Sequence, residues 1–168
     1  MRIEDAIALI SKGVNTQGAP QTWADFGSGR GLFTYTLYSI LPRGSALHAV
    51  DIEQSDYHYP TGVTFHLADF SRDQLTLPPL DGIVMANSLH YIQDQSACIR
   101  RIKNYLCDTG KIILIEYDTN RPNQWVPFPI TFLRAQELFR ASGFSYVTKI
   151  GERKSIFRGD KIYAALIS

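Results

Sequence analysis

Short apolar segments that do not alternate with polar residues recur along the chain, separated by polar stretches. A strand with both faces buried has such a continuous apolar run, which is typical of a parallel sheet covered by helices on both sides. We therefore predict an α/β fold. Its strands are expected over residues 23–26, 46–50, 63–67, 82–86, 111–117, 144–150 and 161–167.

Apolar residues at helical spacing lie between these segments. They predict four helices, over residues 3–13, 31–41, 94–106 and 131–142, the last closed by Gly143. Residues 118–130 are rich in proline and predict an irregular segment, and residues 151–160 predict a polar loop. The order helix, strand, loop, strand at the end of the chain permits an antiparallel hairpin at the edge of the sheet.

The first predicted strand runs directly into a glycine turn, WADFGSGRG, with Gly27, Gly29 and Gly31 at alternate positions. Glycine lacks a Cβ atom, so it allows positive φ angles and the close approach of a ligand to the backbone. The helix that follows directs its first N–H groups towards that ligand. Strand, glycine turn and helix form the opening unit of a nucleotide-binding domain.

Polar residues end five of the predicted strands. They are Asp25, Asp51, Asp69, Asn87 and Glu116. In an open α/β sheet the ligand binds at the carboxyl ends of the strands. A carboxylate that ends the second strand suits the hydroxyl groups of a ribose. The pattern therefore predicts a nucleoside site at this edge.

The spacing of the glycines argues against a dinucleotide. The dinucleotide fingerprint is G-x-G-x-x-G, whereas here the third glycine falls one residue early and Leu32 holds its place. Asp25 directly precedes the turn, where it would oppose a pyrophosphate. A carboxylate at this position instead suits a cationic ligand, such as one with an ammonium group.

With these motifs in order, the sequence resembles the class I S-adenosylmethionine-dependent methyltransferases over about residues 20–167. The matching motifs are DFGSGRG, HAVDIE, LADF, ANSLHYIQD and LCDTGKIILIEYD. The resemblance implies a three-layer Rossmann-like fold with a mostly parallel seven-stranded sheet, whose last strand is inserted antiparallel. It also implies S-adenosyl-L-methionine as the cofactor.

The resemblance implies that the glycine turn, with Ser28, borders the methionine part of the cofactor. Asp25 would engage the amino group of the cofactor through water. The backbone of Asn87, with Ser88 and Leu89, would line the methionine end near the transferred methyl group.

The nucleoside part of the cofactor would meet the next two strands. The resemblance implies that Asp51 binds the ribose and that Ile52 packs on the adenine. Asp69 and Phe70 would hold the edge of the adenine.

The chain departs from the family pattern in three respects. The connections after the second and third strands are short, so helices there are reduced or missing. Asn87 is followed by Ser-Leu-His and not by the Pro-Pro-aromatic sequence of amino methyltransferases that act on DNA bases or glutamine. Cys98 and Cys107 lie on one predicted helix, past the ligand end, which argues against a cytosine methyltransferase and against a disulfide within a straight helix.

His90 and Tyr91 follow the fourth strand, where a methyl acceptor would approach. The ordinary pKa of histidine, about 6.5, suits a general base. Tyr117 and Asp118 are second candidates. Each of these residues also has a purely structural interpretation, such as packing or capping at a helix start.

Two later segments are candidates for contact with the substrate. The segment around Trp125 is either a lid or a rigid crossover that packs Trp125, Phe128 and Ile130 on the sheet. Arg153 and Ser155 form either an anion site or a solvated basic loop.

The composition narrows the class of partner. The 168 residues favour one domain, residues 1–168, with residues 1–19 as an N-terminal helix and loop. The net charge of +1 gives no reason to expect nucleic acid or an anionic membrane. We expect a soluble, cytoplasmic protein without a metal, and a homodimer stays open.

The leading hypothesis is the transfer of a methyl group from S-adenosylmethionine to a small-molecule acceptor by in-line displacement. The alternatives are an NAD(P)-dependent oxidoreductase and a non-catalytic subunit that binds S-adenosylmethionine.

Overall fold

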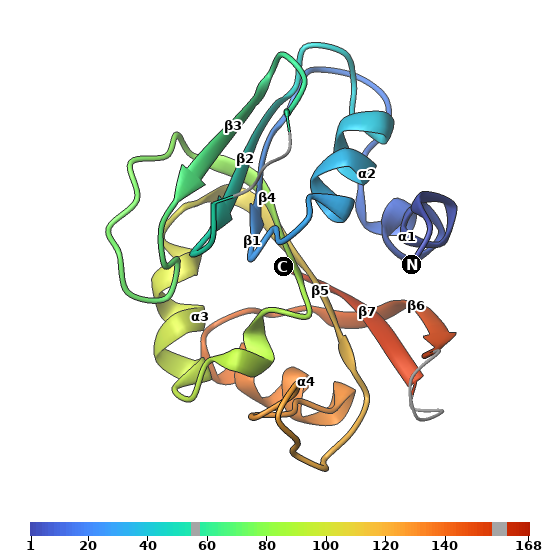
Figure 1. Cartoon of the computed structure of the whole chain (residues 1–168), viewed down its shortest axis with the longest axis vertical. Coiled ribbons are helices and arrows are strands. Elements are labelled where there is room, and N and C mark those ends of the chain that lie inside the picture. The colour runs from blue at the N-terminus through green and yellow to red at the C-terminus, as the bar shows by residue number, and fades with distance from the viewer. Residues whose placement is uncertain (55–57, 156–160) are drawn as a thin grey trace.

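The computed structural model of the chain describes residues 1–54, 58–155 and 161–168 (Figure 1). Its strands are β1 (Thr22–Phe26), β2 (Ala46–Asp51), β3 (Val63–Leu67), β4 (Leu80–Ala86), β5 (Leu106–Tyr117), β6 (Val147–Lys154) and β7 (Lys161–Ile167). Its α-helices are α1 (Ile3–Ile10), α2 (Leu32–Ile40), α3 (Gln95–Lys103) and α4 (Phe132–Ala141). Short 3₁₀ helices cover Ser11–Gly13 and Leu89–Tyr91.

The strands form one sheet in the order β3-β2-β1-β4-β5-β7-β6. The pairs from β3 to β5 are parallel, whereas β7 is antiparallel to both β5 and β6. The chain therefore reverses its strand order between β1 and β4, and a ligand site is expected at that point. This arrangement confirms the predicted seven-stranded sheet with an antiparallel hairpin at its edge.

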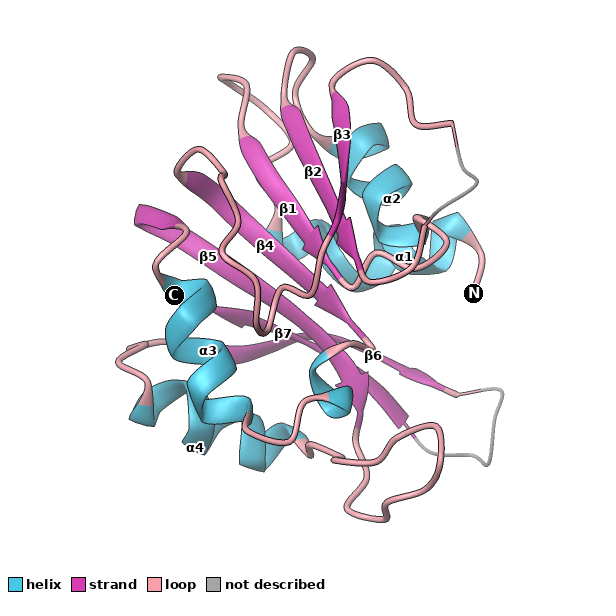
Figure 2. Cartoon of the chain, turned by 60° about the vertical axis from the view of Figure 1, so that its left-hand side comes forward, coloured by secondary structure: helices cyan, strands magenta, loops and turns pink. Residues whose placement is uncertain are grey.

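Helices α1 and α2 cover one face of the sheet and α3 and α4 cover the other (Figure 2), and a hydrophobic core lies on each face. One core contains the apolar residues of α1 and α2, and the other contains those of α3 and α4. Along β5, Ile112 and Leu114 face the second core while Ile113 and Ile115 face the first. Because successive side chains of a strand point to opposite faces, this run is apolar at every position.

The boundary between α3 and β5 differs from the prediction. The helix was expected to reach residue 106, but it ends at Lys103, where Asn104 and Tyr105 close it with hydrogen bonds to carbonyls three residues earlier. Pairing with β4 then begins already at Leu106, with a register shift before Lys111. Cys107 consequently lies on β5, so it does not share a helix with Cys98, and both cysteines are free.

The prediction for β6 was shifted towards the N-terminus. The expected strand covered residues 144–150 with a loop after it, but pairing with β7 extends the strand from Val147 to Lys154. Polar residues are tolerated because this strand is at the sheet edge, where Glu152 forms ion pairs with Lys149 and Lys161. The remainder of the predicted loop, residues 156–160, lies outside the described residues.

The connections after β2 and β3 carry no helix in the parts that the structure describes, residues 52–54, 58–62 and 68–79. This agrees with the expectation from their length. No helix among the described residues is long and apolar enough to cross a membrane.

Candidate active site

The glycine turn links β1 to α2 and is attached to the end of β2. Gly27, Gly29 and Gly31 have φ angles of 79°, 50° and 75°. The N–H groups of Gly27 and Ser28 donate to the carbonyl of Val50 over 2.8 and 3.1 Å. The turn therefore lies between β1 and β2, at the edge where the parallel strands end.

Ser88 holds this turn from the other side. Its hydroxyl donates to the carbonyl of Phe26 over 2.7 Å, at the end of β1. A Cβ atom on Gly27 would lie 2.4 Å from the Cβ of Ser88, a distance that excludes every side chain. Glycine is thus required at position 27 both by its φ angle and by the contact with the segment after β4.

Asp25 is buried below the turn, with an exposed fraction of 1%. Its Oδ2 accepts a hydrogen bond from the Thr34 hydroxyl over 2.7 Å, while Oδ1 is buried without a partner among the described residues. Burial raises the pKa of Asp25 to about 7, although the hydrogen bonds from Thr34 act in the opposite direction. The carboxyl group can therefore gain a cationic partner at Oδ1.

Asp51 ends β2 beside the turn. One carboxylate oxygen accepts the N–H of Gly29 over 2.7 Å, and the other accepts the N–H of Glu53 over 3.0 Å. The next residue, Ile52, has an exposed fraction of 68%. The end of β2 thus presents a carboxylate and an apolar side chain next to each other.

Asp69 and Phe70 follow β3 and have well-defined structural contacts. One Asp69 oxygen accepts both the N–H and the hydroxyl of Ser71, over 2.9 and 2.6 Å, so it closes a turn. The Phe70 ring is buried and stacks on Phe26 at 5.3 Å. The ring therefore supports β1 below the glycine turn, and of the two apolar candidates only Ile52 is exposed for an adenine face.

Asn87 and Leu89 follow β4. Asn87 has a φ angle of 54°, and among the described residues it is the only one other than glycine with a positive φ angle. Its Oδ1 atom is buried without a partner among the described residues. Leu89 is fully buried in the core that contains α3, so only its backbone can line a site. A left-handed asparagine is uncommon and is often found at functional positions.

His90 forms a buried pair with Glu116 of β5, and both side chains are at most 2% exposed. The His90 Nδ1 lies 2.5 Å from one carboxylate oxygen, and the backbone N–H of His90 donates to the other over 3.2 Å. An ionised carboxylate only accepts hydrogen bonds, so for an ionised Glu116 we assign the proton of this contact to Nδ1 and the free lone pair of the neutral ring to Nε2. The structure therefore gives Glu116 a partner that the sequence did not identify.

Three aromatic candidates lie at different depths. Tyr91 is 53% exposed, and its ring centroid is 4.4 Å from that of His90. Tyr117 ends β5 and lines a cavity, described next. Trp125 is 69% exposed at a turn closed by Asn123, which contradicts the packing of this side chain in the rigid-crossover alternative, whereas Ile130 of the same segment is buried in the core that contains α4.

A cavity of about 490 Å³ lies between α1, the start of α2 and the ends of β4, β5 and β6. Its lining combines apolar residues, Asn87 and several charged residues. The lining residues are Met1, Arg2, Asp5, Leu32, Phe33, Asn87, Tyr117, Arg153, Lys154, Ser155 and Ile162. Neither Arg2 nor Asp5 could be found by sequence reasoning, because only the packing of α1 brings them near β6.

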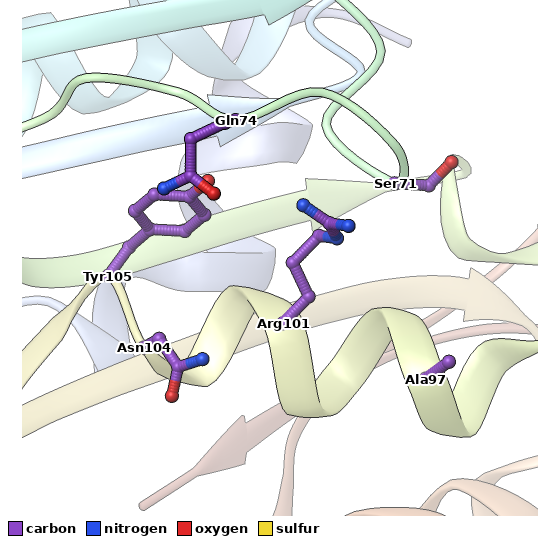
Figure 3. Close-up of a pocket in the computed structure, with 6 residues that line it drawn as sticks. All are labelled: Ser71, Gln74, Ala97, Arg101, Asn104 and Tyr105. Atoms are coloured by element: carbon purple, nitrogen blue, oxygen red, sulfur yellow. The ribbon is translucent and has the colours of Figure 1, made fainter.

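A second cavity, of about 350 Å³, lies between the segment after β3 and α3 (Figure 3). Arg101 and Tyr105 point from α3 and its end towards the segment that carries Ser71 and Gln74, and Ala97 and Asn104 complete the lining. Its lining contains no residue of the glycine turn, and Ser71 is the residue that it shares with the turn closed by Asp69. No group of three or more His, Cys, Asp or Glu residues that could hold a metal occurs in the described part of the chain.

Comparison with known proteins identifies the family. A family model described as a methyltransferase domain matches residues 2–150. Among curated proteins no match is found.

Several solved structures share the fold. One is 1,6-didemethyltoxoflavin-N1-methyltransferase of Burkholderia thailandensis, with a TM-score of 0.72, 19% identity and coverage of 98% of this chain and 76% of that one. YcgJ of Bacillus subtilis has a TM-score of 0.75, 12% identity and coverage of 98% and 97%. A SAM-dependent methyltransferase of Aquifex aeolicus has a TM-score of 0.72, 16% identity and coverage of 98% and 90%. With the family match over most of its length, the chain belongs to the class I S-adenosylmethionine-dependent methyltransferases.

Proposed function

We propose that the chain transfers a methyl group from S-adenosylmethionine to a small-molecule acceptor bound in the 490 Å³ cavity. One observation carries this proposal. The described residues contain four buried side-chain polar atoms without a partner, and all lie around the glycine turn: Asp25 Oδ1, Ser28 Oγ, Asn87 Oδ1 and the Tyr59 hydroxyl, next to Gly31. Buried polar groups without partners are rare, so their clustering supports a polar ligand at this position.

The residues present fit S-adenosylmethionine. Asp25, with an unpaired oxygen, suits the ammonium group of the cofactor, and the backbone and amide of Asn87 lie in the same cluster. A Cβ atom on Gly29 would meet nothing within 4 Å, so the turn leaves space above it. Asp51 is the acceptor for the ribose hydroxyls, with Ile52 on the adenine face and the turn at Asp69 on the adenine edge.

The bound cofactor supplies an electrophilic methyl group on a sulfonium. The protein contributes mainly by holding the acceptor in line with that methyl group, which is worth roughly 7–11 kcal/mol in favourable cases. In this chain Asn87 and Tyr117 lie at the ends of β4 and β5 and also line the cavity. We therefore assign to them the positioning of the acceptor. Trp125 is exposed but does not line the cavity, so we assign it no contact with the acceptor there.

His90 is proposed as the general base for an acceptor that arrives protonated. In the free chain its ring is buried and lies outside the cavity lining, beside the ring of Tyr117, so the proposal requires the acceptor to come within reach of Nε2 when it binds. Glu116 holds Nδ1 and fixes the ring, so Nε2 keeps the lone pair that takes the proton. The rings of Tyr91 and Tyr117 flank His90, with centroids at 4.4 and 6.2 Å. Glu116 acts through His90 and is therefore a positioning residue.

Small-molecule acceptors are supported by the named neighbours. The Burkholderia enzyme was solved with 1,6-didemethyltoxoflavin, and human N-acetylserotonin methyltransferase, at 21% identity and a TM-score of 0.67, is named for a small acceptor. The cavity volume is in the range of small-molecule sites.

Isothermal titration calorimetry of the full chain tests the proposed function. We expect one saturable site for S-adenosylmethionine and for its demethylated product, S-adenosylhomocysteine, and no binding of NADH or NADPH. The absence of binding at millimolar S-adenosylhomocysteine would contradict the proposal, and saturable binding of NADH in its place would favour an oxidoreductase.

A further inference from the structure

We propose that Arg153 selects a methyl acceptor with an anionic group, either a carboxylate or a phosphate. This inference rests on the proposed function, because it concerns the acceptor cavity of the same site.

The cavity places two guanidinium groups against one carboxylate. Arg153 Nη1 lies 3.3 Å from Asp5 Oδ2, and Arg2 Nε lies 3.9 Å from the same oxygen. Lys154 also belongs to the lining, so three cationic residues are accompanied by one acidic residue. Asp5 alone cannot neutralise this charge, and the lining therefore favours an anion.

Arg153 is the residue among these that is best placed for specific recognition. Its side chain is 27% exposed, whereas that of Arg2 is 82% exposed. Arg153 is paired in register with Ile162, which is buried in the core containing α1, so its side chain leaves β6 on the same face. A partly buried guanidinium loses less of its attraction to solvent screening than an exposed one. Its planar set of N–H groups also matches a carboxylate or phosphate in two-point contact.

The rest of the lining suits a flat or apolar body. Phe33, Ile162 and Tyr117 supply aromatic and aliphatic surface, and Asn87 connects the cavity to the glycine turn. Ligand sites commonly combine apolar walls with a few polar groups that fix orientation. These walls therefore suit an acceptor that has an aromatic or cyclic body and one acidic group.

The cofactor carries a carboxylate of its own, so the anion that Arg153 binds could belong either to the cofactor or to the acceptor. Arg153 lies on β6, which is four strand positions away from β1 and its glycine turn in the sheet order. At the usual spacing between strands, β6 lies about 19 Å from β1 across the sheet. The cavity itself extends from Arg153 to Leu32 at the start of α2, so the strand separation and not the cavity wall keeps Arg153 from the turn. We therefore assign the anion at Arg153 to the acceptor.

Calorimetry with simple probes tests this assignment. The full chain is saturated with S-adenosylhomocysteine and titrated with benzoate, phenyl phosphate and neutral benzamide. We expect benzoate or phenyl phosphate to bind at least tenfold more tightly than benzamide. Arg153→Gln should remove this preference, and Arg153→Lys should keep part of it. Arg134→Gln, on the exposed surface of α4, is the matched control and should behave as the wild type.

Asp5→Asn should change the affinity for benzoate in the opposite direction from Arg153→Gln. If Asp5 competes with the bound anion for Arg153, its neutralisation should strengthen benzoate binding severalfold. If the Asp5–Arg153 pair serves only to attach α1 to β6, Asp5→Asn and Arg153→Gln should both weaken the fold and leave the anion preference unchanged, which would overturn the inference.

Three further outcomes separate the role of Arg153 from the proposed function. Normal S-adenosylhomocysteine binding with no anion preference in the wild type overturns the role of Arg153 and leaves the proposed function intact. A tenfold loss of S-adenosylhomocysteine affinity in Arg153→Gln, without loss for 5′-methylthioadenosine, assigns the anion to the cofactor and overturns the acceptor assignment. Absence of S-adenosylhomocysteine binding in the wild type contradicts the proposed function itself, and this inference with it.

Discussion

The carboxylate of Asp51 accepts the backbone N–H of Gly29 over 2.7 Å and so joins the end of β2 to the glycine turn. One carboxylate thereby shapes the turn and faces the position proposed for the ribose. A substitution at Asp51 is expected to act on cofactor binding more than on folding, because the contact lies at the exposed edge of the sheet.

Asp51→Ala should weaken S-adenosylhomocysteine binding by tenfold to several hundredfold. Hydrogen bonds to a charged group are worth roughly 1.5–3 kcal/mol each, and at least one such bond to the ribose would be lost. Titration calorimetry gives the dissociation constant, with circular dichroism as the check on folding. Glu53→Ala, two residues on, is the control and should bind normally; equal affinities of both variants and the wild type would exclude Asp51 from the cofactor site.

Gly27→Ala should destabilise the fold and abolish cofactor binding. The substitution combines a positive φ angle, which costs about 1–2 kcal/mol, with a Cβ atom 2.4 Å from that of Ser88. Gly18 also has a positive φ angle, but no atom lies within 4 Å of its Cβ position. Gly18→Ala should therefore lose only the stability that corresponds to the φ angle. Urea unfolding measures both.

The double variant Gly27→Ala/Ser88→Gly separates strain from contact. Removing the Ser88 side chain relieves the overlap, so the pair should be more stable than Gly27→Ala alone. If Ser88→Gly lowers the stability of the Gly27→Ala variant further, the contact between residues 27 and 88 is not the cause of the destabilisation by Gly27→Ala.

The affinity for S-adenosylhomocysteine should fall as the pH decreases below about 7. The pKa of buried Asp25 is about 7 in the free protein, and an ammonium group binds its ionised form. Below this pH a proton must leave before the ligand binds, so the affinity approaches a tenfold loss per pH unit. Asp25→Asn should bind more weakly at pH 8 and show a flat profile. 5′-Methylthioadenosine, which lacks the amino group, should also show a flat profile; a profile as steep as that of S-adenosylhomocysteine would exclude Asp25 as the partner of the ammonium group.

The same pKa shift predicts the stability of the free protein. The folded state holds the Asp25 proton to about pH 7, whereas the ordinary value is 3.8. The contribution of Asp25 is therefore greatest at low pH and is lost as the pH rises from about 4 to about 7. In Asp25→Asn this loss should be absent from a series of urea midpoints against pH, and an unchanged series would contradict the assigned pKa.

The His90 ring should carry its proton on Nδ1 in the neutral state. Long-range ¹H–¹⁵N correlation spectra distinguish the two ring nitrogens directly. In Glu116→Gln the amide oxygen can keep the bond from the His90 backbone N–H, and the amide NH₂ then faces Nδ1. The ring should consequently change to the Nε2–H form and lose its accepting nitrogen. A wild-type ring with the proton on Nε2 would remove His90 as the base.

Local sequence was sufficient to predict the glycine turn and the polar residues at the strand ends. The φ angles at Gly27, Gly29 and Gly31 and the place of Asp51 depend on a few neighbouring residues. The contact of Ser88 with the end of β1 joins residues 62 positions apart, and sequence spacing contains no sign of it. The Glu116–His90 pair was missed for the same reason, although an acidic residue at the end of an apolar strand was a usable signal.

The cavity was beyond prediction because it depends on tertiary packing. Asp5 lies in a segment that was predicted only as the first helix, and Arg153 was assigned to a loop that proves to be part of β6. Pairing with β7 extended that strand and brought Arg153 opposite α1. Composition and periodicity do not contain such pairing between distant segments.

A crystal structure of the chain with S-adenosylhomocysteine would show whether the glycine turn and the ends of β1 and β2 hold the cofactor. We predict the ribose hydroxyls on the Asp51 carboxylate, the amino group beside Asp25, directly or through one water, and the sulfur facing the cavity lined by Asn87 and Tyr117. A nucleoside bound away from Asp51, for example between Ser71 and Tyr105, would contradict this prediction.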